Sequence, residues 1–324
     1  MKKGRKRFWK RFRRAVREPV VMAAYACASL IVPRLPRAWL LQLAGGLGTL
    51  TRYCDRAGRR VARANLAVLC GRRLTPRRSR LLVAGAYRLA ALVALDSVWF
   101  ARDTRARVGR WTTVDPVLDA AVRPARPALL ISGHYGNWEM TLLAGGYAGL
   151  PLVAVVKQQW SPLLTERLNR VRCALGVRVV FVEGALRSLL RELRAGNVAG
   201  FLVDQQTLPK EGGVWVDFGG LPAAVTNGVA VLSRHTAAPV FLAFCRACRD
   251  GHYRVTGSAA MRAAPDETDA AFTQRIVNGL LRTFRRHPSQ WMLMYKYWDN
   301  VAPGDDFERY PFYAGPRRRV PCTN

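Results

Sequence analysis

The segment from Gly133 to Glu139 has the residue types and the spacing of an acid–base site. It reads Gly-His-Tyr-Gly-Asn-Trp-Glu, so a histidine lies between two glycines and precedes a glutamate by five positions. A carboxylate that holds one imidazole nitrogen fixes the tautomer and stabilises the imidazolium, and it leaves the other nitrogen free as a general base. We therefore predict that His134 is a catalytic base and that Glu139 supports it. The alternative is a hydrogen-bonded turn histidine without a chemical role.

A strand and a helix are needed to position this pair. The apolar run at 128–131 is followed by serine and glycine, which is typical of a buried strand that ends in a turn. Residues 138–143 have the apolar density of a helix, with Asn137 as its N-cap. Five positions on one helix would turn the two side chains about 140° apart, so we place His134 in the turn and Glu139 on the helix. The backbone amides of 135–137 are then predicted to stabilise an oxyanion.

Alternating apolar runs and helical patterns predict an α/β fold with a mostly parallel central sheet flanked by helices. We expect the following strands and helices: strands at 128–132, 152–156, 177–182 and 199–203, and helices at 138–147, 162–174 and 185–195. Ligands of such sheets bind beyond the carboxyl ends of the strands. Three of these strands are followed by His134, Lys157 and Asp204, so we predict that these three residues lie at one edge of the sheet.

Several residues besides the histidine are predicted to bind substrate. Lys157 has the charge to contact a phosphate or a developing oxyanion. Asp204 and Gln205 have the polar groups to orient sugar hydroxyls, and a structural turn is the alternative. Thr226 and Asn227 precede a predicted helix, where they either bind an anion or only cap the helix.

Metal and cofactor chemistry have little support in the sequence. Cys245 and Cys248 have the spacing of metal ligands but lack a second pair, and His235 and His252 lack acidic partners at a useful spacing. Neither a glycine-rich phosphate loop nor a dinucleotide fingerprint occurs. We predict a site that uses no metal and no cofactor. The odd number of cysteines, seven in all, argues against a disulfide framework and for a reducing compartment.

The charge of the chain predicts anionic partners. There are 52 Lys and Arg against 21 Asp and Glu, which gives a net charge of +31, while a 50% apolar content is enough to fill a core. Nucleic acid, phospholipid headgroups and an acidic carrier protein all fit this charge. Nucleic acid is the weakest of the three, because the basic N-terminal arm leads into an apolar stretch and no nucleic-acid-binding module follows.

The N-terminal region predicts attachment to a membrane. Residues 2–17 hold ten basic residues, and the uncharged stretch from Val20 to Val32 has 13 residues, fewer than the roughly 20 that span a bilayer. Basic residues on both sides place both flanks on the cytoplasmic face, which favours an interfacial anchor. A single-pass anchor, a buried core helix and a cleaved signal peptide are the alternatives. We expect a basic arm and anchor at 1–37, a helical region at 38–105 that packs on the core, and an α/β domain at 106–324.

The segment at 133–139 resembles the histidine-x4-acid motif of the bacterial lipid A biosynthesis acyltransferases, the lauroyl and myristoyl transferases. Further similarity follows in order from about residue 20 to 300. It is carried by Leu35-Pro36, Leu47-Gly48, Arg59 to Ala62, Asn65-Leu66, Leu202 to Gln206, Val214 to Gly228 and His287 to Trp291. The resemblance implies a glycerolipid-acyltransferase-like fold, with the helical region of the N-terminal part packed on an α/β acyltransferase domain.

The same resemblance implies an O-acyltransferase at the cytoplasmic face of a bacterial inner membrane. Such an enzyme moves a fatty acyl chain from acyl carrier protein to a hydroxyl of a lipid A precursor or related glycolipid, next to an anionic membrane surface. Two departures from the family pattern concern Lys157, which stands near a family arginine, and the Tyr-Lys-Tyr run around Lys296, a substrate-binding candidate that replaces histidine and arginines. They keep open an acyl-CoA-dependent transfer to a phosphatidylinositol mannoside-like lipid.

Overall fold

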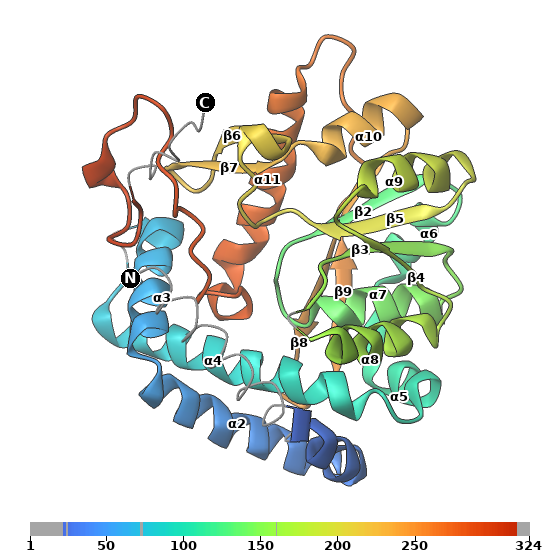
Figure 1. Ribbon diagram of the computed structural model, residues 1–324, viewed down its shortest axis with the longest axis vertical. Coiled ribbons are helices and arrows are strands. Elements are labelled where there is room, and N and C mark those ends of the chain that lie inside the picture. Colours follow the sequence, from blue (N-terminus) through green and yellow to red (C-terminus); the bar gives the residue numbers. More distant parts are fainter. Residues whose placement is uncertain (1–21, 24, 72–73, 160, 316–324) are drawn as a thin grey trace, which may run out of the picture.

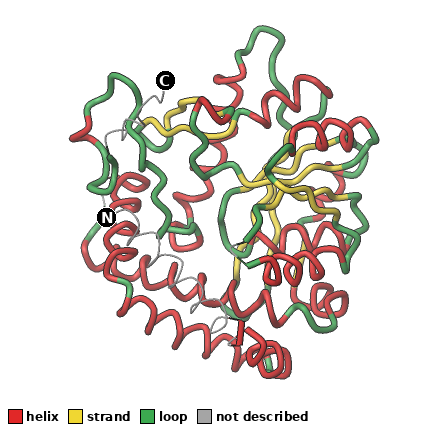
Figure 2. Tube along the Cα trace, viewed as in Figure 1, coloured by secondary structure: helices red, strands yellow, loops and turns green. Residues whose placement is uncertain are grey.

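The fold is mixed α/β and is built on a mostly parallel sheet. We analysed a computed structural model, which describes residues 22–315 except 24, 72–73 and 160 (Figures 1 and 2). The seven strands lie in the order β1-β9-β8-β2-β5-β3-β4, and only the β8–β9 pair is antiparallel. Their bounds are β1 Thr112–Val114, β2 Ala128–Ser132, β3 Leu152–Val156, β4 Arg178–Phe181, β5 Val198–Leu202, β8 Val240–Ala247 and β9 Tyr253–Gly257. The predicted fold class is therefore confirmed at the level of a mostly parallel sheet between helices.

Helices cover both faces of this sheet. The helices around it are α5 Thr104–Trp111, α6 Pro116–Val122, α7 Trp138–Tyr147, α8 Pro162–Cys173, α9 Ala185–Arg194, α10 Gly228–Thr236 and α11 Asp269–Arg286. All five residues of β2 are buried, as a central parallel strand requires. Because successive side chains of a strand point to opposite faces, Leu129 and Ile131 join one apolar core while Ala128 and Leu130 join the other. The sheet thus holds β2 rigidly on both sides.

Three helices of the N-terminal part pack against the sheet and its helices and contribute buried residues to the same two apolar cores. They are α2 Arg37–Cys54, α3 Arg56–Cys70 and α4 Pro76–Trp99, and Figure 1 shows α4 between α2 and the rest of the molecule. A buried ion pair fixes α2 to α4, because Arg37 on α2 contacts Asp96 on α4 and also donates a hydrogen bond to the Gly251 carbonyl at 2.9 Å. Among the described helices, α4 alone is long and apolar enough to cross a membrane by length and composition, a test that core helices also pass.

The predicted anchor lies partly outside the described residues. The basic arm at 2–17 and the start of the apolar stretch are not described. Residues 25–31 are helical, and their side chains are half-buried or exposed. This exposure disagrees with the alternative of a buried core helix at this position. The small antiparallel hairpin of β6 (Gly213–Asp217) and β7 (Pro222–Thr226) was not predicted from the sequence.

Candidate active site

His134 lies in the turn that follows β2, and a buried carboxylate holds its ring. The register of the sheet pairs Ser132 of β2 with Leu202 of β5, so the residues after these two strands meet at one edge. The His134 Nδ1 atom is 2.8 Å from Asp204 Oδ1, and the His134 backbone amide donates to Asp204 Oδ2 at 2.9 Å. The indole Nε1–H of Trp291 donates to the same Oδ2 at 3.0 Å. Asp204 is therefore the carboxylate that orients the imidazole.

The surroundings of Asp204 keep it ionised. Burial by itself would raise the pKa of this carboxyl, because a low-dielectric environment disfavours charge. The His134 ring and the hydrogen bonds from Trp291 and from the His134 amide outweigh burial and hold the pKa of Asp204 below its ordinary value. A permanent negative charge beside Nδ1 favours the tautomer in which Nδ1 carries the proton. The other ring nitrogen, Nε2, is then unprotonated and can accept a proton.

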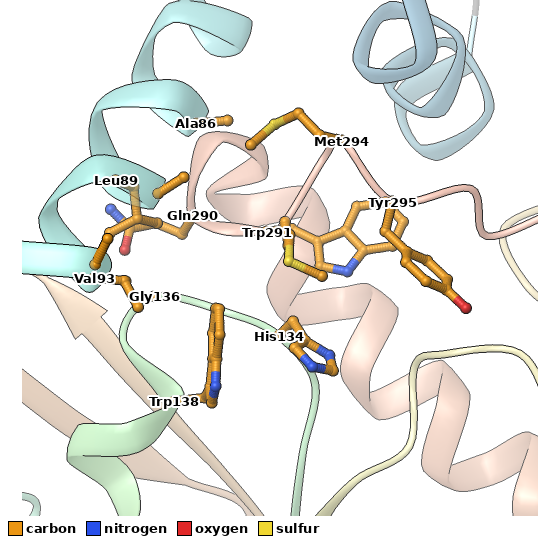
Figure 3. Close-up of a pocket in the computed structure, with 13 residues that line it drawn as sticks. Ala86, Leu89, Val93, His134, Gly136, Trp138, Gln290, Trp291, Met294 and Tyr295 are labelled. Atoms are coloured by element: carbon orange, nitrogen blue, oxygen red, sulfur yellow. The ribbon is translucent and has the colours of Figure 1, made fainter. Parts of the chain in front are cut away.

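An apolar cavity of about 440 Å³ opens beside the His134 ring. Figure 3 shows Ala86, Leu89 and Val93 of α4 on one side of it and His134 and Trp138 on the other. The Trp138 ring packs edge-on against the imidazole, with centroids 4.9 Å apart. The complete lining consists of Ala86, Leu89, Ala90, Val93, Ala94, His134, Gly136, Trp138, Gln290, Trp291, Met292, Met294 and Tyr295. The imidazole thus faces a space whose walls suit a hydrocarbon chain.

Two glycines allow the turn to bring His134 to this position. A Cβ at Gly133 would lie 2.9 Å from Asp204 Oδ2 and 2.6 Å from the Phe284 ring, so a side chain there would displace the carboxylate. Gly136 has a φ of +57°, and a Cβ on it would lie only 1.6 Å from the Cys245 carbonyl oxygen. Other residues rarely adopt this backbone conformation. The two glycines that bracket the histidine are therefore required by packing.

The prediction that Glu139 contacts His134 is wrong. The Glu139 carboxylate accepts two hydrogen bonds from Arg172 of α8, from Nε at 2.8 Å and from Nη2 at 2.7 Å. Burial opposes the charge of Arg172, but the hydrogen bonds and charge of Glu139 raise the pKa of this guanidinium above its usual value. The first turn of α7 directs Glu139 toward α8, while Asp204 reaches the imidazole from the neighbouring strand. The motif's acid therefore holds an arginine in this structure.

The predicted oxyanion site at the backbone amides of 135–137 is also wrong. Each of these amides already has a partner: Tyr135 donates to the Gly133 carbonyl at 2.7 Å, Gly136 to Gln290 at 2.7 Å and Asn137 to Cys245 at 3.1 Å. A different donor lies at the unprotonated ring nitrogen: Gln205 Nε2 is 3.3 Å from His134 Nε2 and donates a hydrogen bond to it in this tautomer. The predicted site residue Gln205 is thus adjacent to the base.

Asn137 begins α7 as predicted, but its side chain does not cap the helix. Its Nδ2 donates to the buried Asp96 Oδ2 at 3.3 Å, and the hydroxyl of Tyr253 donates to the same oxygen. Asp96 also pairs with Arg37 of α2. The turn that carries the histidine is therefore tied through Asp96 to helices α2 and α4.

The other predicted site residues lie apart from His134. Lys157 is exposed after β3, which β5 separates from β2 in the sheet. Thr226 accepts a hydrogen bond from the Gly228 amide at 3.1 Å, and Asn227 accepts one from Thr273 at 3.1 Å, so both stabilise the start of α10. Lys296 is 3.6 Å from Asp299 in an exposed ion pair. The structure thus joins only Asp204 and Gln205 of the predicted substrate-binding set directly to the histidine.

Sequence reasoning missed the partners that complete the site. Trp291 and Arg172 were not assigned roles, and Asp204 was assigned to substrate. A signal for Asp204 was present, because it lies two residues after the end of the parallel strand β5, as His134 lies two residues after the end of β2. Trp291 ends the His-Pro-Ser-Gln-Trp run that carried part of the family resemblance.

The whole of this site lies within a region that matches one family. The family model of the bacterial lipid A biosynthesis acyltransferases matches residues 9–300. The chain belongs to this acyltransferase family. It is 24% identical over 280 residues to the lipid A biosynthesis palmitoleoyltransferase of Escherichia coli (strain K12), a match that covers 84% of this chain and 89% of that protein. The lipid A biosynthesis acyltransferase of Shigella flexneri is similar to the same extent.

This acyltransferase also resembles an enzyme that is named for another lipid. It is 28% identical over 191 residues to the phosphatidylinositol mannoside acyltransferase of Mycobacterium tuberculosis (strain ATCC 25618 / H37Rv). This match covers 56% of this chain and 57% of that protein. The family and the relatives agree that the chain is an acyltransferase of membrane lipids.

Proposed function

We propose that this acyltransferase moves a fatty acyl chain from acyl carrier protein to a hydroxyl of a lipid A precursor or related glycolipid. The observation that carries the proposal is the orientation of His134 by a buried Asp204 at the wall of an apolar cavity. The pair supplies a base, and the cavity supplies a place for a hydrocarbon chain. The family and its named relatives support both the reaction class and the lipid acceptor.

In the proposed mechanism His134 Nε2 accepts the proton of the acceptor hydroxyl. Asp204 keeps the Nδ1 proton in place and stabilises the imidazolium that forms. The acceptor oxygen attacks the thioester carbonyl carbon, and the resulting tetrahedral intermediate collapses as the C–S bond breaks. The imidazolium returns its proton to the departing thiolate, so the products are an ester and a free thiol. The transfer passes through no acyl-enzyme.

The oxyanion of the tetrahedral intermediate requires a donor close to the base. We propose the side-chain amide of Gln205, whose Nε2 is 3.3 Å from His134 Nε2. A donor of this kind commonly stabilises the transition state by about 3 kcal/mol. Lys157 and Lys296 are exposed cations, and we propose that they contact phosphates of the acceptor. Glu139 stays in the proposal as a positioning residue that holds Arg172, and a substrate contact at Thr226 and Asn227 stays a prediction.

The proposed location is the cytoplasmic face of a bacterial inner membrane. The net charge of +31 suits both an acidic carrier protein and an anionic lipid surface, and the basic arm and apolar stretch at 1–37 suit an interfacial or single-pass anchor.

Purified enzyme tests the proposal directly. Acyl carrier protein loaded with a fatty acid is incubated with a lipid A precursor, and mass spectrometry measures the gain of one acyl group. His134→Ala is expected to lower the rate by roughly 10²- to 10⁴-fold, because it removes the general base. His252→Ala removes a partly exposed histidine that the proposed reaction does not use and serves as the control. Full activity of His134→Ala would refute the proposed base.

One observation favours a second candidate. The similarity to a phosphatidylinositol mannoside acyltransferase supports a mannoside-like acceptor as an alternative, and we propose acyl-CoA as the donor in that case. Acyl carrier protein and CoA thioesters of the same chain are compared side by side against both acceptors. A preference for the CoA thioester and the mannoside would replace the first candidate with the second.

A further inference from the structure

The outer face of α2 is an unusual surface, because it is continuous, apolar and exposed. Trp39, Leu43, Leu47, Leu50 and Tyr53 follow one another at helical spacing, and Trp39, Leu50 and Tyr53 are 63%, 60% and 67% exposed. We call these five residues the α2 outer face. Contiguous apolar surface of this kind marks an interaction site more often than scattered apolar residues do. Nothing in the proposed reaction uses it.

The opposite side of α2 is fixed to the protein. Leu40 and Ala44 are buried, and Arg37 forms the buried ion pair with Asp96. Moving α2 away from α4 would expose the buried Asp96. We therefore expect α2 to stay packed on α4 and to contact its partner along the length of the α2 outer face. Figure 1 shows α2 along the outer edge of the molecule, with α4 on its inner side.

We propose that the α2 outer face lies in the surface of an anionic lipid bilayer. No charged residue occurs between Arg37 and Arg52, whereas the sequence from 34 to 105 holds 15 arginines against three aspartates. An uncharged apolar face with arginines beyond its ends is the pattern of a helix that lies in the interface and binds anionic headgroups. Trp39 and Tyr53 stand near the two ends of the face, and such aromatic residues favour headgroup level.

This surface places the bilayer on the α4 side of the cavity. Ala86, Leu89 and Val93 of α4 line the cavity, while the opposite side of α4 packs against α2. A bilayer on the α2 outer face is then separated from the cavity by the two packed helices α2 and α4, or roughly 20 Å. The inference deepens the proposed function, since the acceptor proposed above is a membrane lipid, and it assigns the membrane contact to α2 in addition to the predicted anchor.

Lipid flotation with the full chain tests the inference without any need for acyl transfer. Vesicles of phosphatidylethanolamine with about 30% phosphatidylglycerol are used in roughly 0.5 M NaCl, where screening weakens the contribution of the basic arm. The double variant Trp39→Glu/Leu50→Glu is expected to lower the partition coefficient about a hundredfold, or about tenfold for each substitution. Both side chains point into solvent, so the circular dichroism spectrum should not change.

The matched control is Val117→Glu/Leu186→Glu. It adds the same two charges at exposed apolar positions on α6 and α9 and is expected to stay within about twofold of the unchanged protein. Equal binding of the α2 double variant and the unchanged protein would overturn the inference, as would the absence of wild-type binding. A dimer in lipid-free solution that only the α2 double variant dissociates would assign the face to a second copy instead.

Activity assays keep a failure of this inference distinct from a failure of the proposed function. The α2 double variant is expected to acylate a detergent-dispersed acceptor at the normal rate and a vesicle-embedded acceptor about tenfold or more slowly. If the unchanged protein acylates neither acceptor, the result counts against the proposed function alone, because flotation still reports on the α2 outer face. Equal rates of the double variant on both acceptors would count against this inference alone.

Discussion

Two carboxylates, those of Asp204 and Glu139, lie at the segment 133–139, and each pairs with a different nitrogen-containing side chain. Asp204 is completely buried and holds His134, whose imidazole is a group that can transfer a proton. Glu139 has a side chain that is 25% exposed and holds Arg172, whose guanidinium stays charged. The first pair faces the apolar cavity, and the second lies between α7 and α8.

The comparison teaches that the partner, rather than the carboxylate, decides what such a pair does. A carboxylate beside an imidazole orients a group that can transfer a proton. A carboxylate beside a guanidinium makes a fixed bidentate contact, which positions two helices. The sequence motif contains the second acid, but the imidazole contacts the first. The predictions below test this division of roles.

Asp204→Asn is expected to have the largest effect. To keep accepting hydrogen bonds from Trp291 and the His134 amide, the new side chain must turn its NH₂ group toward Nδ1. The proton then moves to Nε2, and the base is lost. We expect kcat to fall by roughly 10²- to 10⁴-fold while the fold is kept. Asp266→Asn changes an exposed aspartate and is the control; a normal rate for Asp204→Asn would contradict the proposed role of Asp204 in orienting the base.

Glu139→Gln is expected to act first on stability. It leaves the largely buried Arg172 without a charged partner, which should lower the free energy of unfolding by about 1–3 kcal/mol. Glu166→Gln breaks a pair with Arg170 on the same helix, but both side chains there are mostly exposed, so the expected loss is below about 0.5 kcal/mol. Urea unfolding of the two variants measures the difference. Equal losses would mean that the Glu139–Arg172 pair has no structural role.

A double-mutant cycle separates the two carboxylates directly. His134→Ala combined with Asp204→Asn should show a coupling of about 0.5–3 kcal/mol in unfolding free energy, because the two side chains are in contact. His134→Ala combined with Glu139→Ala should be additive within about 0.5 kcal/mol, because Arg172 is the partner of Glu139. Strong coupling in the second cycle and none in the first would reverse the assignment.

The smallest expected effect concerns acid stability. Burial opposes ionisation of Asp204, but His134 and the hydrogen-bond donors still hold its pKa in the folded protein below the value of about 3.9 that an unfolded chain has. The contribution of ionised Asp204 to the free energy of unfolding is therefore present above about pH 4, and it is lost as the pH falls through the pKa that Asp204 has in the folded protein. The free energy of unfolding, measured from pH 6 to pH 3, should therefore fall less steeply for Asp204→Asn than for the unchanged protein. A parallel loss in both proteins would contradict this linkage.

Local patterns were sufficient for much of the fold. The predicted elements at 138–147 and 152–156 coincide with α7 and β3, and the predicted strand at 128–132 coincides with β2. These elements are set by side-chain periodicity and by the turn residues between them. The same local reading placed His134 correctly in a turn at the carboxyl end of a buried strand.

The partner of His134 was beyond such a reading. Asp204 is 70 residues away in the sequence, and it reaches the imidazole because β5 is the hydrogen-bonded neighbour of β2. Strand order depends on packing of the whole chain, so spacing alone favoured the nearer Glu139. The amides of 135–137 failed as an oxyanion site for a similar reason, since Gln290 and Cys245 arrive from distant segments and accept two of their hydrogen bonds.

The sequence by itself determined the strands and helices of the parallel sheet, the histidine at its edge and the acyltransferase family, because these depend on periodicity and on short motifs. The tertiary structure alone decided which acid holds the imidazole, which cavity the imidazole faces and which side of α2 remains exposed. Each of these depends on segments that lie far apart in the chain and meet only after the helices have packed on the sheet.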